Sequence, residues 1–167
     1  MYVTLLQLAE SPGALELAQV ASASHEAVVD AELMDRTLRN GDRSTYTAAA
    51  IAAADEAKAR INELIDEAGG VIDGYLARRY TLPLPALPKI LVTWARAIVR
   101  YKLNKDRQTD ERSDPVVRDY RDALKFLQQA AEGKFSLGIE DPEQGATSDG
   151  EVRFQSGAKV FGRKVLP

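Results

Sequence analysis

The sequence predicts an all-α protein, a compact helical bundle. From Tyr46 to Arg79 apolar residues recur at three- and four-residue steps, the spacing of one helical face. A nearly all-apolar helical pattern follows from Lys89 to Lys105, and prolines between the two forbid a continuous helix. With 167 residues, 45% of them hydrophobic, we expect one helical domain over residues 1–138 and a tail over residues 139–167.

The composition argues against an enzyme. The chain has no cysteine and a single histidine, His25, so thiolate metal sites and serine–histidine–aspartate chemistry find almost no candidates. Phosphate-binding loops and dinucleotide fingerprints are not found in the sequence. We therefore expect no catalytic residue, no metal and no cofactor. No apolar run approaches the roughly 20 residues of a membrane span, so we expect no membrane and synthesis in a cytoplasm.

Short helical pieces are predicted at the start of the chain. Thr4 can cap a first turn, and Pro12-Gly13 should break the helix before a second piece from Ala14 to Val20. The pattern then weakens over residues 21–46, where one short helix from Glu26 to Leu38 fits the apolar spacing. We expect this stretch to be an exposed loop or insertion.

The long helix should start near Tyr46 or Thr47 and end near Arg79. Gly69-Gly70 interrupts its pattern, which predicts a bend or the close approach of another helix. A stiff, apolar elbow follows, and its leucines alternate with prolines, so we expect it to be buried. The elbow residues are Tyr80, Leu82, Pro83, Pro85 and Pro88.

Two further helices complete the predicted bundle. The one over Lys89 to Lys105 leaves only a narrow polar stripe, so we expect it to be central, with Trp94 in the core. The next begins at Ser113 or Asp114 with Pro115 in its first turn, and ends at Gly133. Phe126 lies off its buried face, where a tertiary contact and a subunit interface explain it equally well.

The tail divides into two parts by charge. Residues 139–151 carry only acidic charges together with proline and glycine, which is typical of a flexible segment. Residues 152–167 alternate apolar and polar positions around Ser156-Gly157, which predicts an arm or a small hairpin. A lone hairpin is marginal in water, so we expect it to dock on this chain or on another subunit, through Phe154 and Phe161.

Basic residues concentrate in one segment. Residues 78–107 carry a net charge of +7, so the rest of the chain carries −10. The candidate contacts to nucleic acid or to an acidic neighbour are Arg78, Arg79, Arg96 and Arg100. The last two lie one helical turn apart and suit a phosphate or an acidic helix equally well.

Four motifs in order resemble the Mu-like phage and prophage neck protein family. They are YLARRYTLPL at Tyr75 to Leu84, AIVRYKL at Ala97 to Leu103, RDYRDALKFL at Arg118 to Leu127 and GKFSLG at Gly133 to Gly138. The match spans Ile61 to Gly138, about half the chain. What the resemblance implies is a head–tail connector, or head completion protein.

Such a connector would be a structural virion protein, located in the neck between head and tail. It would assemble as a ring, expected to be a dodecamer, below the portal protein and extend the DNA channel. The implied partners are other copies of itself, the portal, the next neck or tail-completion protein, and packaged DNA without sequence preference. We expect one ring-forming patch on the long helix and the other on the C-terminal segment, because closed rings join two different patches. A different class is a soluble helical adaptor or regulator that binds nucleic acid as a dimer.

Overall fold

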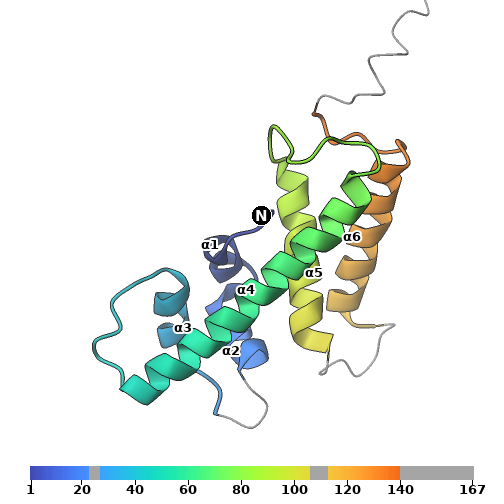
Figure 1. Cartoon of the computed structure of the whole chain (residues 1–167). Coiled ribbons are helices and arrows are strands. Elements are labelled where there is room, and N and C mark those ends of the chain that lie inside the picture. Colours follow the sequence, from blue (N-terminus) through green and yellow to red (C-terminus); the bar gives the residue numbers. More distant parts are fainter. Residues whose placement is uncertain (23–26, 106–112, 140–167) are drawn as a thin grey trace, which may run out of the picture.

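A computed structural model of the chain describes residues 1–22, 27–105 and 113–139 (Figure 1). Every regular element in these residues is helical, which confirms the all-α prediction. The acidic segment, the C-terminal arm with Phe154 and Phe161, and the connection over residues 106–112 lie outside the described residues.

The N-terminal pieces form as predicted. In α1 (Leu5–Leu8) the backbone N–H of Gln7 donates to Thr4 Oγ1 at 3.3 Å, and the Gln7 side chain accepts from the Thr4 N–H at 2.9 Å. This reciprocal capping box satisfies two amides that have no partner within the helix. A π-helical segment, η1 (Ala9–Gly13), leads to α2 (Ala14–Ala21). Ser11 leaves helical geometry there at φ −156° and ψ 119°, so the predicted break before α2 is confirmed.

The short helix predicted within Glu26 to Leu38 is found as α3 (Ala31–Leu38), but it packs in the core, so the expectation of an exposed loop or insertion is wrong there. Leu33, Met34 and Leu38 are no more than 1% exposed and pack in the common core. Thr37 shares their buried face, where its hydroxyl donates to the Leu33 carbonyl at 2.8 Å. A polar residue on the buried face weakens the apolar pattern, which is why the sequence suggested exposure.

The long helix α4 (Ala48–Leu76) organises the molecule. Thr47 caps it, and its buried residues recur every three or four positions: Ala54, Ala57, Ile61, Ile65, Ala68, Ile72 and Leu76. In Figure 1, α3 lies beside the first half of α4, whereas α5 and α6 lie beside its second half. The helix continues through Gly69-Gly70, where an added Cβ would meet nothing within 4 Å. The predicted close approach is therefore wrong, because both glycines lie off the packed face.

Helices α5 (Lys89–Asn104) and α6 (Pro115–Ala131) follow the predicted bounds. α5 contacts α4, α6 and α2, and Trp94 is 5% exposed, so its central place and the tryptophan's core position are confirmed. Asp114 caps α6 by accepting from the Val116 N–H at 2.8 Å, with Pro115 in the first turn. Gly133 ends this region with a φ of +75°, the left-handed conformation expected there.

The elbow joins α4 to α5, but it is not buried as expected. Tyr80 is 4% exposed, whereas Leu82 and Leu84 are half-buried and Leu87 is 46% exposed. The connection runs over the surface because loop carbonyls without partners in the protein need water. The elbow therefore presents apolar side chains to the outside.

Candidate functional site

Arg100 is committed to an acidic helix of its own chain. Its Nη2 donates to Glu16 Oε2 of α2 at 2.7 Å, and its Nε donates to the other carboxylate oxygen. This two-bond pairing raises the pKa of Arg100 and joins α5 to the N-terminal helices. Of the two partners that the sequence allowed, an acidic helix is the one found.

Arg96 lies one turn earlier and lines a cleft of about 560 Å³ between α2, α5 and α6. Its Nε is buried and has no hydrogen-bond partner in the described part of the chain. Asp119 and Asp122 of α6 line the same cleft, so the Arg96 guanidinium shares the cleft with two acidic side chains. The structure thus brings Arg96 and Arg100 together, beside acidic residues.

Arg78 and Arg79 lie elsewhere, at the C-terminal end of α6. The Arg79 guanidinium lies directly against Gly133, where it would overlap any added Cβ. Arg78 is exposed and adds to the effects of Lys134 and Gln128, which lower the pKa of Glu132 mainly through hydrogen bonds. Both arginines therefore sit where the helix dipole is negative, a position that favours cations.

Two residues of the basic segment form ion pairs with acidic residues of other helices. Besides the Arg100 pair, Lys102 Nζ lies 2.7 Å from Glu67 Oε2 of α4. The four candidate arginines occupy two separate places in the described part of the chain. The two ion pairs hold α5 against α2 and α4.

Phe126 makes the tertiary contact that was one of the two roles its sequence position left open. Its ring stacks on Trp94 with centroids 6.0 Å apart and 2° between the planes, and it also contacts Phe135 at 5.8 Å. It nevertheless remains 38% exposed at the edge of the cleft that contains Arg96. The tertiary contact is thus observed, and its exposed edge is available to a partner.

The elbow forms one side of a second surface that the sequence did not predict. Met1, Leu84 and Leu87 line a hollow of about 380 Å³, and Met1 and Leu87 are 81% and 46% exposed. We call this the elbow surface. The Tyr2 hydroxyl donates to Asp73 of α4 and anchors the N-terminus against it. No local signal in the sequence points to this bond, because its two residues lie 71 positions apart.

Among the described residues, no three acidic or histidine side chains come together to hold a metal ion. In the same residues, no helix is long and apolar enough to cross a membrane.

Comparison with known proteins decides the family. The model of the family described as Bacteriophage Mu, Gp36 matches residues 2–156. The chain belongs to this family. The Mu-like prophage FluMu protein gp36 of Haemophilus influenzae is 38% identical over 108 residues, covering 65% of this chain and 74% of the relative. Gene product J of Escherichia phage Mu is 34% identical over 104 residues, covering 61% and 70%.

The Gp36 family match extends beyond the motifs that suggested it. Those motifs lie between Ile61 and Gly138, whereas the family model includes the N-terminal helices, α3 and residues as far as 156. Membership of a Mu-like phage family is therefore confirmed, and α3 belongs to the part that the family shares.

Proposed function

We propose that this protein is a structural subunit of the phage neck, a head–tail connector without enzymatic activity. In this proposal, copies form a ring, expected to be a dodecamer, on the portal at the head vertex. The ring extends the DNA channel, receives the next neck or tail-completion protein, and supports tail joining. Membership of the Gp36 family supports a role in the phage particle or its assembly.

The observation that carries the ring proposal is the position of two different hollows near opposite ends of α4. The elbow surface lies near Asp73 at the end of α4, and a second apolar hollow is lined by Ala49 and Ala53 near its start. Twenty helical residues separate Ala53 from Asp73, roughly 30 Å at 1.5 Å per residue. A ring needs two unlike patches on each subunit, and these two hollows are candidates for contact with neighbouring subunits.

The positions of the arginines suit a subunit that lines a DNA channel better than a regulator that binds nucleic acid as a dimer. Arg78 is exposed, but Arg79 lies against the end of α6 and Arg100 is paired with Glu16. A dimeric nucleic-acid regulator would need a continuous surface of free cations to hold phosphates. A ring needs fewer on each subunit, because every copy repeats the same exposed arginine around the channel.

The test uses DNA-filled heads that carry the portal but lack this protein. We expect purified protein to add ring-shaped density at the portal vertex, visible by electron microscopy, and to restore tail joining. The matched control is the same protein heated until unfolded, which should add nothing. The connector proposal fails if no density appears and tails join normally to heads that never received the protein.

A further inference from the structure

A groove with an acidic edge lies between α3 and the start of α4. It has a volume of about 680 Å³, and its apolar lining includes Val28, Val29, Leu33, Ala49, Ala52 and Ala53. We call it the α3–α4 groove. Alanines give it depth, because their short side chains leave space along the surface of α4. Val28 is 56% exposed in it and adds to the apolar surface that a partner could cover.

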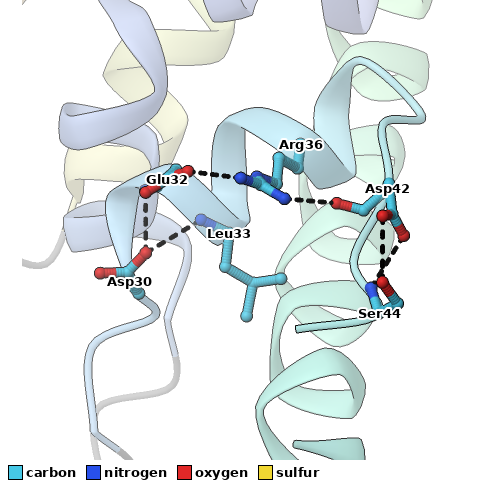
Figure 2. A network of polar contacts seen from close by, with 6 residues as sticks. All are labelled: Asp30, Glu32, Leu33, Arg36, Asp42 and Ser44. Carbon is cyan, nitrogen blue, oxygen red and sulfur yellow. Dashed lines mark hydrogen bonds and ion pairs between the residues drawn. The ribbon is translucent and has the colours of Figure 1, made fainter. Parts of the chain in front are cut away.

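A polar network holds the wall of this groove in place (Figure 2). Asp30 accepts from the N–H groups of Glu32 and Leu33 at 3.0 Å, which fixes the start of α3. Arg36 donates to Glu32 at 2.6 Å and to the Asp42 carbonyl at 2.9 Å, which ties the loop after α3 back to the helix. The Ser44 N–H and hydroxyl donate to Asp42 and lower its pKa. The groove is therefore preformed, which reduces the entropic cost of filling it.

The charges around the groove select a basic occupant. Its only charged lining residues in the described part of the chain are Asp30 and Glu56, both acidic. Glu56 lies 3.5 Å from Arg60 but is 59% exposed, so this single pairing screens it weakly. A segment that combines apolar side chains with lysine or arginine would fill the groove and meet both carboxylates.

The end of this chain has that composition. Residues 152–167 contain four basic residues and no acidic one, together with two phenylalanines, three valines and a leucine. The preceding residues 139–151 are purely acidic in charge, so the groove would repel them. The arm, residues 152–167, therefore matches the groove in both charge and apolar character, whereas residues 139–151 do not match its charge.

Reach favours the groove of another copy. The segment after α6, described as far as residue 139, lies near the end of α4 that is away from α3 (Figure 1). α4 has 29 residues and is roughly 40 Å long. Ala53 in the groove lies 23 residues before the end of α4 at Leu76, roughly 35 Å along the helix. The 12 residues from 140 to 151 span about 40 Å when fully extended, so reaching the chain's own groove would stretch them almost completely.

We propose that the arm of one copy, residues 152–167, docks in the α3–α4 groove of a second copy. Arm and groove are different surfaces, so the contact is head-to-tail and can close a ring. The inference rests on the proposed function and deepens it by naming a contact between neighbouring subunits. Its test needs no portal, so the two proposals can fail separately.

The absence of cysteine from the chain makes a cross-linking test direct. Two full-length single variants, Ala52→Cys in the groove and Ala158→Cys in the arm, are mixed under mild oxidation. Only contacts between copies can then give the mixed disulfide dimer, which we expect in at least tenfold higher yield than with the control partner Ala59→Cys. Ala59 is exposed on α4 about two turns beyond Ala52 and outside the groove lining.

A charge reversal checks the recognition itself. Arg163→Glu in the Ala158→Cys chain should lower the yield of mixed dimer several-fold, because it places a carboxylate near Asp30 and Glu56. Arg118→Glu, an exposed position on α6, should leave the yield unchanged.

Two outcomes would overturn the proposal. One is an equal yield with Ala52→Cys and Ala59→Cys. The other is a double variant, Ala52→Cys/Ala158→Cys, that closes only within single chains, which would place the arm in its own groove. If cross-linking succeeds but the protein adds nothing to portal vertices, the self-contact stands and the connector proposal fails.

Discussion

At the scale of single residues, the pairing of Arg100 with Glu16 should couple α5 to α2. Both side chains are about one-third exposed, at 32% and 27%, so solvent screens the attraction and we expect a coupling of about 1 kcal/mol. A double-mutant cycle with Arg100→Ala and Glu16→Ala, measured by urea denaturation, gives this energy directly.

The control cycle for that pair uses Arg118 and Asp119. They lie 3.8 Å apart and are 72% and 52% exposed, so their coupling should be close to zero. Equal couplings in the two cycles would show that the Arg100 pair holds nothing together.

Two tyrosines predict opposite effects of the same substitution. Tyr2→Phe removes the bond to Asp73 and should lower stability by about 1 kcal/mol. The Tyr80 hydroxyl is buried and has no partner in the described residues, so Tyr80→Phe should be neutral or stabilising. Urea denaturation at neutral pH measures both variants, and a stabilised Tyr2→Phe would contradict the anchoring role of Tyr2.

The Tyr2 bond also predicts a dependence on pH. Burial raises the pKa of the Tyr2 hydroxyl in the folded chain. The hydrogen bond to Asp73 and the negative charge of Asp73 raise this pKa further. A raised pKa means that the stabilisation is complete below the unfolded value of about 10 and is lost as pH rises above it. The stability difference between wild type and Tyr2→Phe should therefore be constant from pH 7 to about 9 and shrink in more alkaline buffer. A difference that grows there would contradict this sign.

At the scale of elements, the sequence predicted what local patterns encode. Thr47, Asp114 and Pro115 mark helix starts through their own side chains, and each stands where it was expected. The packing of α3 was missed because Thr37 interrupts its buried face. The bond between Tyr2 and Asp73 joins residues 71 positions apart, and no local pattern reports such a contact.

The candidate sites were predictable to a smaller degree, for the same reason. The sequence picked out Arg100, but its spacing alone left the choice between phosphate and carboxylate open until α2 was in place. The α3–α4 groove was not predicted at all. Its alanines carry no chemical signal, and the groove exists only where α3 meets α4.

Glycines within and after helices should respond oppositely to alanine. Gly70 lies inside α4 with open space around it, so Gly70→Ala should stabilise the protein by about 1 kcal/mol. Gly133→Ala should destabilise it by at least about 1 kcal/mol, because φ is +75° and the new Cβ would displace Arg79. Urea midpoints measure both, and an unchanged Gly133→Ala would contradict the left-handed turn after α6.

At the scale of the whole molecule, a substitution on the elbow surface should impair assembly and leave folding almost unchanged. Leu87 is 46% exposed, so Leu87→Asp should change the free energy of unfolding by no more than about 0.5 kcal/mol. If the elbow surface is covered in the assembled particle, the same change buries an unpaired carboxylate. That costs more than about 1.4 kcal/mol, a factor of ten in affinity.

We therefore expect Leu87→Asp to fold normally and to reduce tail joining at least about tenfold, when it is supplied to heads that lack this protein. Ala59→Asp introduces the same charge at an exposed position on α4 away from the elbow surface, and should join tails as wild type does. Thermal denaturation checks the first expectation, and counting joined particles by electron microscopy checks the second. Normal joining by Leu87→Asp would mean that the elbow surface stays open to solvent in the particle and takes no part in assembly.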